Sequence, residues 1–390
     1  MRDPLNSKVR AIKPSGIRKF FDNVKEIDGA ISLGVGEPDF DTPWHIREEG
    51  IYALERGKTF YTSNAGLLEL REEIAKYLER RQGLSYDFKN EILVTIGGSE
   101  AIDAALRAML DAGDEVLIPE PCYVSYVPCV TLADGVPVTI DLKEENSFKL
   151  TREELLGAIT DKTKILIMPF PNNPTGGIMT REDLEAIADV IIEKDLFVIS
   201  DEIYSELTYG RDHVSIASLP GMKERTIVIN GFSKSYAMTG WRLGYACGPE
   251  AILKQMTKIH QFAIMCAPTT SQCAAIEALR NGDEDVLRMR EAYDERRRYL
   301  VTRLNEMGFH TFEPEGAFYV FPSIKHTGMT SDEFATALLK EEKVAVVPGT
   351  AFGDCGEGFL RISYAYSIEN LKTALDRIER FMKNHEYSAS

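Results

Sequence analysis

The segment from Ser233 to Tyr245, SKSYAMTGWRLGY, sets a lysine beside a serine and places an arginine eight residues after the lysine. The amine of Lys234 can condense with an aldehyde to form a Schiff base. The hydroxyl of Ser233 and the guanidinium fork of Arg242 can hold a phosphate. These residue types at this spacing predict a site for a phosphorylated aldehyde, with Lys234 as its covalent anchor.

The whole segment, including the run MTGWR, resembles the lysine signature of class I/II aminotransferases, the aspartate/aromatic aminotransferase-like branch of fold type I. The resemblance extends over nearly the whole chain. It implies that the cofactor is pyridoxal 5'-phosphate (PLP) and that an amino acid and a 2-oxo acid are the substrates. It also implies ping-pong transfer of the α-amino group of an L-amino acid, in which Lys234 is both covalent anchor and general acid and base.

The motif GGSE at 97–100 comes between a β-branched run at 92–96 and an amphipathic stretch. The backbone N–H groups of Gly98, Ser99 and Glu100 would therefore lie at a helix N-terminus, which favours a phosphate. The resemblance likewise implies a phosphate site at this point. The sequence has no GxGxxG after its first strand, and this speaks against a dinucleotide cofactor.

Two further motifs follow predicted strands, and ligands in open α/β sheets bind beyond the carboxyl ends of strands. In PEPCYVSY, the ring of Tyr123 is expected to stack on the cofactor's pyridine. In PFPNNPTG, the resemblance implies that Asn173 donates to the cofactor's phenolic oxygen and contacts the substrate carboxylate. The resemblance also makes the peptide bonds Glu120–Pro121 and Asn173–Pro174 candidates for the cis form.

The motif SDEIYSEL at 200–207 supplies two candidates. Asp201 is expected to lie near the pyridine nitrogen, where a carboxylate would keep that nitrogen protonated. Tyr204 is expected to reach the phenolic oxygen and to lower the pKa of the imine. Glu202 should point to the opposite side of the strand and have a structural role. Asp201 and Tyr204 join Lys234 as the expected catalytic residues.

The substrate side of the site is expected to come from outside this strand-rich region. In LRISYA, the guanidinium fork of Arg361 could bind the substrate α-carboxylate through two parallel hydrogen bonds. Gly36, in LGVGEPDF, would permit close backbone approach to the same carboxylate. The resemblance implies that Tyr61 reaches the cofactor phosphate of a neighbouring subunit, and therefore that a homodimer has shared active sites.

The elements that must position these residues follow an α/β pattern. Short β-branched runs alternate with amphipathic stretches, which predicts a largely parallel sheet. The runs are at 92–96, 115–119, 137–140, 164–170, 196–200 and 226–230. Helix starts are signalled by Thr151 with Glu154 and by Thr180 with Asp183. The fold class expected is that of fold-type-I PLP transferases, with a mostly parallel seven-stranded sheet flanked by helices and a smaller α+β domain.

The pattern changes near residue 281, where a long charged helix begins and runs through Glu306. Beyond it we expect a strand at 317–321, a helix near 331–342, a strand in FLRISYA and a final helix. The resemblance assigns the N-terminal segment to this same small domain. The domains expected are 1–44 as that segment, 45–280 as the large PLP-binding domain and 281–390 as the small C-terminal domain.

Composition excludes several classes of protein. The chain has 390 residues, 44% of them apolar, and a formal net charge of −16 that would repel nucleic acid. No window approaches the roughly 18 apolar residues of a membrane helix, and no apolar leader opens the chain, so we expect a cytoplasmic protein. Six cysteines without a CxxC pair and six histidines without metal-ligand spacing indicate reduced thiols and no metal.

Two alternatives remain open at this point. A PLP-dependent carbon–sulfur lyase or decarboxylase would use nearly the same cofactor shell on the same fold. A non-catalytic PLP-binding regulator needs a DNA-binding module, and only about 30 residues precede ISLGVGEPDF. A stoichiometric keto-acid product would distinguish transamination from both.

The side chain of the substrate must be met by residues outside the cofactor shell. The segments PSGIRKF and HQFAIMCAPTT contain small or apolar candidates for this contact: Gly16, Ile17, Phe262, Ile264 and Met265. We therefore expect neutral or aromatic amino acids as donors, with aspartate or glutamate also possible. Arg18 and Lys19 are cations close enough in sequence to bind a second carboxylate.

Overall fold

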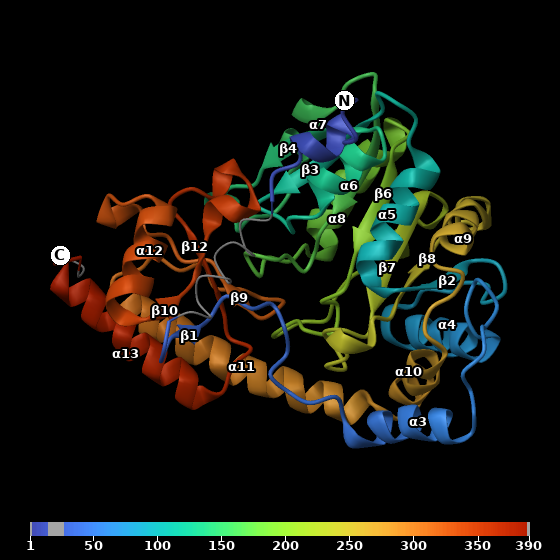
Figure 1. Cartoon of the computed structure of the whole chain (residues 1–390). Helices are drawn as coiled ribbons and strands as arrows, with labels where there is room; N and C mark the ends of the chain where they lie inside the picture. The colour runs from blue at the N-terminus through green and yellow to red at the C-terminus, as the bar shows by residue number, and fades with distance from the viewer. Residues whose placement is uncertain (1, 15–26, 388–390) are drawn as a thin grey trace.

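The larger of the two lobes in the computed structural model is built on one seven-stranded sheet (Figure 1). The structure describes residues 2–14 and 27–387. The strand order is β2-β8-β7-β6-β5-β3-β4, and only β8 runs antiparallel to its neighbours. The strands are β2 (Ile92–Thr95), β3 (Glu115–Glu120), β4 (Val136–Asp141), β5 (Thr163–Met168), β6 (Phe197–Asp201), β7 (Thr226–Gly231) and β8 (Gly244–Cys247). The mostly parallel seven-stranded sheet is confirmed.

Successive side chains of a strand point to opposite faces of the sheet. Both faces are buried here, because helices cover each of them. In β5, Ile165 and Ile167 belong to the core on one face, whereas Leu166 and Met168 belong to the core on the other. Helix α5 (Gly97–Met109) packs against β7 and β8 on the first face, and α8 (Arg181–Glu193) contributes to the second core. The two layers of helices therefore hold the strands, and the residues at the strand ends, in place.

The helices of the large lobe begin where local signals predict. Thr151 and Thr180 both form complete capping boxes, with Glu154 and Asp183 respectively. The helices are α3 (Trp44–Glu55), α4 (Leu68–Gln82), α5 (Gly97–Met109), α6 (Tyr126–Leu132), α7 (Arg152–Ala158), α8 (Arg181–Glu193), α9 (Glu250–Ala263) and α10 (Thr269–Asn281). Within residues 2–14 and 27–387, no helix has the length and apolar composition that crossing a bilayer requires. The short helix α1 (Ser7–Ala11) lies against α6 of this lobe.

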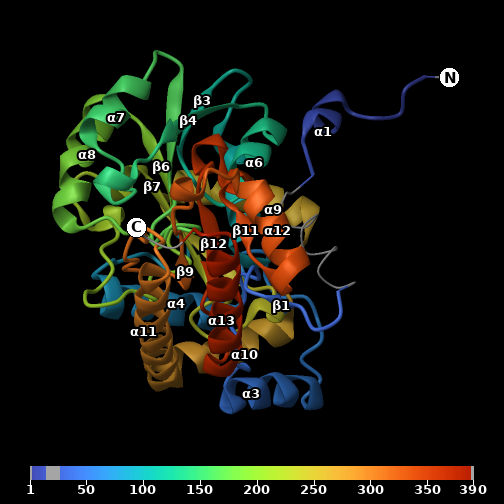
Figure 2. The same cartoon turned by 90° about the vertical axis from the view of Figure 1, so that its left-hand side faces the viewer.

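The smaller lobe mixes helices with short strands, and Figure 2 turns it toward the viewer. Its helices are α11 (Asp283–Glu306), α12 (Ser331–Glu342) and α13 (Ile368–Asn384). Its strands are β9 (Tyr319–Val320), β10 (Val344–Ala345), β11 (Val347–Pro348) and β12 (Leu360–Ser363). The predicted long helix through Glu306 and the helix at 331–342 are confirmed, while the predicted strand at 317–321 is limited to two residues.

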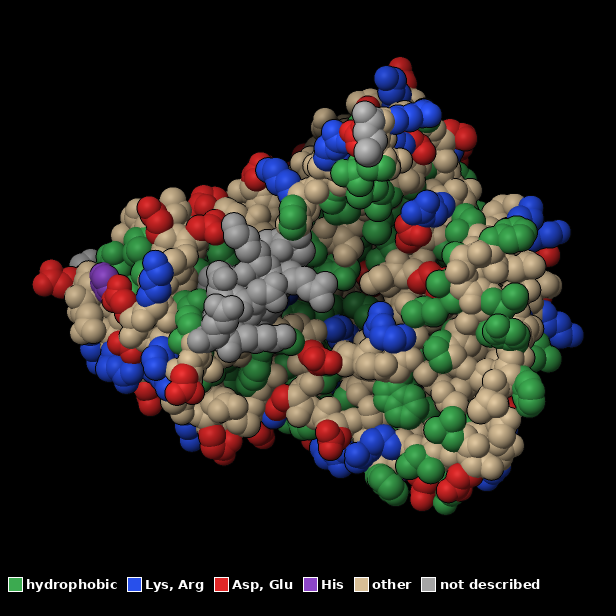
Figure 3. All heavy atoms as spheres, in the orientation of Figure 1, with side chains coloured by type: hydrophobic (Ala, Val, Ile, Leu, Met, Phe, Trp, Pro, Cys, Tyr) green, Lys and Arg blue, Asp and Glu red, His purple; other side chains and the backbone are tan. Residues whose placement is uncertain are grey.

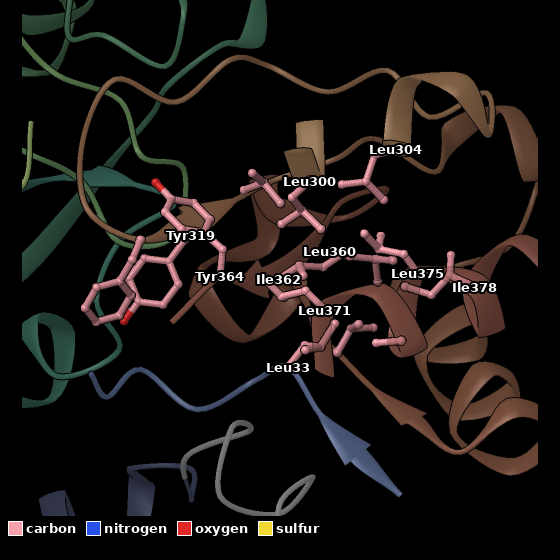
Figure 4. Packing of buried hydrophobic residues seen from close by; sticks show 14 of the residues in the cluster. Leu33, Leu300, Leu304, Tyr319, Leu360, Ile362, Tyr364, Leu371, Leu375 and Ile378 are labelled. Carbon is pink, nitrogen blue, oxygen red and sulfur yellow. The ribbon is translucent and has the colours of Figure 1, made fainter. Parts of the chain in front are cut away.

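The N-terminal segment contributes to the small lobe. Strand β1 (Ile31–Ser32) pairs in parallel with β10, and Leu33 is fully buried in the core of this lobe. Figure 1 shows blue β1 among the orange and red elements, and Figure 4 shows Leu33 beside Leu371. These contacts support the division that we propose, with residues 1–44 joined to 281–390 and residues 45–280 forming the large domain, for the part of the segment around β1. Helix α1 departs from this division, because it contacts α6 of the large lobe.

An ion-pair cluster joins the two segments where the chain passes between the lobes. His45, at the start of α3, contacts Glu277 of α10 through Nδ1 at 2.7 Å and Asp285 of α11 through Nε2 at 2.9 Å. Partial burial lowers the pKa of His45, but hydrogen bonds to Asp285 and Glu277 outweigh it, so the pKa is raised. The imidazolium can donate to both carboxylates at once. It thereby links the start of α3 to the junction of α10 and α11, the two places where the chain passes from one lobe to the other.

Candidate active site

A cavity of about 420 Å³ lies between the lobes and collects most of the predicted site residues. Figure 3 shows a hollow in this region with basic side chains in it. The predicted residues that line it are Gly36, Gly98, Ser99, Tyr123, Asn173, Asp201, Tyr204, Ser233, Lys234, Arg242 and Arg361. We call the lining residues from 97–242 the large-lobe wall, and Val35, Gly36, Glu37, Tyr319 and Arg361 the small-lobe wall.

Lys234 stands on the turn that follows β7 and directs its amine into the cavity. Its Nζ donates a hydrogen bond to the backbone oxygen of Gly36 at 2.6 Å. Burial lowers the pKa of Lys234, and together with the positive charges of Arg361 and Arg242, against the opposing charges of Glu37 and Asp201, it brings the pKa to about 8. About a tenth of this amine is therefore uncharged at pH 7, far more than for an ordinary lysine, and the uncharged form is the one that attacks a carbonyl.

The region around Gly97 forms a cradle that has no room for side chains. A Cβ on Gly97, whose φ is +75°, would lie 2.9 Å from a terminal nitrogen of Arg242. A Cβ on Gly244 would lie 2.6 Å from the carbonyl carbon of Gly97. The cradle joins Arg242, Ser99 and Ser233 with the N-terminus of α5, where backbone N–H groups are free of helical partners. This donor set fits a phosphate.

Two predicted cofactor residues do not line the cavity. The carboxylate of Glu100 accepts from the backbone N–H of Ile96 and pairs with the buried His260. Tyr61 has an exposed fraction of 81% and does not line the cavity of its own chain. The phosphate contact of the Glu100 backbone and the contact of Tyr61 with a second subunit stay predictions.

Asp201 ends β6 and is almost fully buried at the floor of the cavity. Burial raises the pKa of Asp201, although hydrogen bonds from the hydroxyl of Tyr126, at 2.8 Å, and from the N–H of Ile203 lower it. A cationic ring nitrogen opposite this carboxylate would supply the missing counter-charge. Sequence reasoning missed the role of Tyr126, because its separation from Asp201 along the chain gives no local signal.

Glu202 has the structural surroundings expected of it. Its buried carboxylate accepts from the hydroxyls of Ser200 at 2.9 Å and Ser215 at 2.6 Å, and it contacts His213 at 2.9 Å. Glu202 does not line the cavity. The alternation of side chains along β6 therefore separates the two neighbouring acids.

Arg361 is a buried cation with donor capacity left over. One terminal nitrogen donates to Oδ1 of Asn173 at 2.8 Å, and the other donates to the backbone oxygen of Gly34. Its Nε has no hydrogen-bond partner in the part of the chain that the structure describes. The guanidinium lies 4.5 Å from the ring centroid of Tyr319 and 4.7 Å from that of Phe352. This arrangement fits the recognition of a carboxylate.

The loops that carry Tyr123 and Asn173 have the predicted backbone. The bonds Glu120–Pro121 and Asn173–Pro174 are both cis, which confirms both candidates. Phe170–Pro171 is also cis and was not expected. The ring of Tyr123 meets that of Tyr126 edge-on at 5.7 Å and lines the cavity.

The expected contacts with the substrate side chain are not seen at the cavity. Phe262, Ile264 and Met265 have exposed fractions of 87%, 39% and 43%, and none of them lines it. Gly16, Ile17, Arg18 and Lys19 lie outside the described residues. Instead, the lining includes residues that sequence reasoning did not select: Val35, Glu37, Ile102, Tyr126, Pro169, Pro171, Ile203, Thr239 and Tyr319. Several of these residues belong to the motifs already quoted, and membership of a motif was the only sequence signal that could have identified them as lining residues.

Comparison with known proteins agrees with this geometry. Residues 28–378 match the family described as aminotransferase class I and II. The chain is 53% identical to a putative aminotransferase of Bacillus subtilis, covering 98% of this chain and 99% of that protein. It is 48% identical to aromatic-amino-acid aminotransferase 2 of Thermococcus litoralis, covering 97% and 98%. It is 50% identical to an aspartate aminotransferase of Pyrococcus abyssi, with the same coverage.

Solved structures give the same result. An aromatic aminotransferase from Pyrococcus horikoshii superposes with a TM-score of 0.91 at 50% identity, covering 94% of this chain and all of that one. Aspartate aminotransferase from Thermus thermophilus with maleate gives 0.93 at 40% identity, covering 97% and 100%. Enzymes of this class depend on PLP. The chain belongs to the class I and II aminotransferase family and is an enzyme that transfers amino groups.

Proposed function

We propose that this aminotransferase holds PLP in the cavity between its lobes through a covalent bond to Lys234 Nζ. The observation that carries the proposal is the convergence of three features on one cavity. They are the amine of Lys234 with its lowered pKa, the cradle around Gly97 that fits a phosphate, and the buried carboxylate of Asp201, which forms no ion pair among the described residues. When bound, PLP supplies an electron sink that stabilises negative charge at the substrate Cα.

The large-lobe wall would orient the cofactor. Ser99, Ser233 and Arg242 would hold its phosphate, and Asp201 would pair with its ring nitrogen, where the carboxylate would favour the protonated form. The hydroxyl of Tyr204 and the amide of Asn173 would donate to its phenolic oxygen. Tyr123 would stack on the ring. Each of these residues lines the same cavity, which supports the set as a whole.

Lys234 would then act twice. Lys234 would first hold the cofactor through Nζ, and substrate binding would free this nitrogen as a neutral amine. The free amine would then take the proton from the substrate Cα and release it again in the next step. Because the pKa of Lys234 is lowered to about 8, the free amine can both accept and release a proton near neutral pH. The second half-reaction runs the same steps in reverse with a 2-oxo acid.

The small-lobe wall would bind the substrate. Arg361 offers its unpaired Nε and its partly satisfied terminal nitrogens to the α-carboxylate, while Asn173 holds the guanidinium in place. Gly36 brings its backbone next to Lys234. The carboxylate is thereby directed to the side of the cavity from which Lys234 approaches.

We propose that neutral and aromatic L-amino acids are preferred donors. The cations that line the described cavity are Lys234, Arg242 and Arg361, and each already has a role. The carboxylate of Glu37 lines the same cavity and would repel a second carboxylate on the substrate. The tyrosine-rich lining suits an aromatic ring. Relatives named as aromatic and as aspartate aminotransferases are similarly close, so aspartate and glutamate remain in the test.

We also propose a homodimer in which Tyr61 reaches the phosphate of the second subunit. Phe60 and Tyr61 are each 81% exposed, and Phe262 is 87% exposed. Hydrogen bonds from Thr269 to the backbone oxygen of Phe60, and from Asn64 to that of Met265, join the two segments that carry them. Large exposed aromatic side chains on two joined segments support contact with a second copy.

The experiment is a donor panel measured with the holoenzyme and 2-oxoglutarate. Phenylalanine, tyrosine and methionine should give higher kcat/KM than aspartate, and each turnover should release one keto acid per amino group transferred. A preference for aspartate above about a hundredfold, more than a neutral pocket can produce, would overturn the substrate proposal. Borohydride reduction should fix the cofactor on the peptide that contains Lys234, and a label on another lysine would overturn the anchor.

A further inference from the structure

Tyr319 lies where the two lobes meet, and the sequence motifs of the site do not include it. It stands on β9 of the small lobe, is almost fully buried and lines the cavity. Figure 4 shows it at the end of the small-lobe core that is nearest to the large lobe. Tyr319 contacts residues of both the large-lobe wall and the small-lobe wall.

On one side, Tyr319 supports the carboxylate site. Strand β9 pairs with β12, so that Tyr319 is opposite Ser363 in the strand that carries Arg361. The guanidinium of Arg361 lies over the ring of Tyr319, at 4.5 Å from its centroid. A cation over an aromatic face is attracted to it, and the ring also blocks movement of the guanidinium. The position of Arg361 therefore depends on this ring.

On the other side, Tyr319 reaches the large-lobe wall through its hydroxyl. The hydroxyls of Tyr319 and Tyr204 are 2.9 Å apart and share a hydrogen bond. A Cβ on Gly36 would lie 2.4 Å from the Tyr319 hydroxyl, so the absence of a side chain at Gly36 leaves the space that this hydroxyl occupies. The same Gly36 accepts a hydrogen bond from Lys234 Nζ. The Tyr319 hydroxyl is therefore next to Tyr204 and Gly36, and Gly36 in turn accepts from Lys234.

We propose that Tyr319 is a positioning residue that links the carboxylate site at Arg361 to the hydroxyl of Tyr204. The inference rests on the proposed function, in which Tyr204 donates to the phenolic oxygen of the cofactor. A hydroxyl has one proton, so Tyr204 must then accept from Tyr319. The resulting chain of two hydrogen bonds makes Tyr204 a stronger donor, because successive hydrogen bonds polarise one another.

This chain has a chemical consequence at Lys234. A stronger donor stabilises negative charge on the phenolic oxygen, and this charge otherwise helps to hold a proton on the nearby Lys234 nitrogen. The two hydroxyls belong to different lobes, so the effect exists only while the lobes are in the arrangement seen here. Tyr319 thereby makes the proton affinity of Lys234 Nζ depend on the position of the strand pair that carries Arg361.

The test separates the hydroxyl from the ring. The visible absorption of the holoenzyme changes with pH as Lys234 Nζ loses its proton, and the midpoint pH of this change is the main readout. In Tyr319→Phe the midpoint should rise by about 0.3 to 1 pH unit, while the KM for the amino donor stays within about twofold. In Tyr319→Leu the midpoint should rise similarly, and the KM should also rise about 3- to 30-fold because the ring beneath Arg361 is lost.

Two controls make the outcomes distinct. Tyr364→Phe removes another buried small-lobe hydroxyl, which bonds to the backbone oxygen of Ala317 outside the cavity, and should leave the midpoint unchanged. In a Tyr204→Phe background, adding Tyr319→Phe should not move the midpoint further. An unchanged or lowered midpoint in Tyr319→Phe, or equal shifts in both backgrounds, would overturn the inference. If the unmodified holoenzyme shows no such absorption change, the cofactor assignment fails instead.

Discussion

The two walls of the cavity are held in place by different kinds of structure. On the large-lobe wall, Asp201 ends β6 and Lys234 follows β7, two neighbouring strands in the middle of one buried sheet. On the small-lobe wall, Arg361 lies in a four-residue strand of a three-stranded sheet. Its guanidinium also depends on Asn173 from the opposite wall. The side chains of the large-lobe wall are positioned by one lobe alone, whereas the position of Arg361 on the small-lobe wall depends on contacts with both lobes.

This difference separates two parts of the reaction. The groups proposed to contact the cofactor come from the large lobe, and Tyr319 of the small lobe acts on them only through the hydroxyl of Tyr204. The groups proposed to recognise the α-carboxylate come into place only when the small lobe meets the large one. Changes that loosen the contact between the lobes should therefore impair substrate binding before cofactor binding. The predictions below test this separation.

The largest effect is expected at the anchor on the large-lobe wall. Lys234→Ala should reduce kcat by at least about 10³-fold, because both the covalent bond and the proton-transferring amine are lost. Non-covalent binding of the cofactor should survive, since the phosphate cradle is intact, and equilibrium dialysis measures it. Lys258→Ala, at an exposed site on α9, is the matched control and should leave kcat unchanged. Measurable turnover at more than a tenth of the original rate would contradict the assignment.

The same lysine should produce a pH-dependent stability in the cofactor-free protein. Its pKa is about 8 in the folded chain against 10.5 when unfolded, so the unfolded state binds more protons between these values. The free energy of unfolding should therefore rise with pH over this interval, by up to about 3 kcal/mol from Lys234. Denaturant unfolding of wild type and Lys234→Met at several pH values isolates this contribution. Parallel pH profiles would show that Lys234 does not cause it.

On the small-lobe wall, Arg361→Lys should raise the KM for the amino donor by about 10- to 100-fold, with a smaller effect on kcat. Lysine keeps the charge but loses the fork and the stacking between Tyr319 and Phe352. The midpoint of cofactor binding should not change. Arg380→Lys, an exposed residue on α13, is the control. A loss of cofactor affinity in Arg361→Lys would mean that the two walls are not separable in this way.

The smallest effect is expected at the crossing between the lobes. The pKa of His45 is raised by Asp285 and Glu277 against partial burial, so its stabilising contribution is complete below the unfolded pKa of 6.5. It is lost as the pH rises through the folded value. Relative to His45→Gln, the wild type should be more stable by at most about 1 kcal/mol at about pH 6 and by less at about pH 9. An equal difference at both pH values would exclude the imidazolium as the cause.

Much of the fold could be predicted because its signals are local. The capping boxes at Thr151 and Thr180 and the β-branched runs of six strands act over a few residues, and the structure confirms them. Strand β8 was missed as an element because GYAC is short and its first two residues belong to the lysine motif. The strand around Tyr319 is shorter than predicted, because apolar residues beyond it are buried in the core without strand pairing.

The sequence by itself determined which residue types could hold and activate a phosphorylated aldehyde, because each of them lies in a motif at the end of a predicted strand. Only the tertiary structure decided the contacts of Tyr126 with Asp201 and of Tyr319 with Tyr204, which join residues 75 and 115 positions apart. Such partners leave no periodicity or spacing in the chain. The first arises when α6 packs on the large-lobe sheet and the second when the two lobes pack, because burial makes each polar group find a partner that local sequence does not specify.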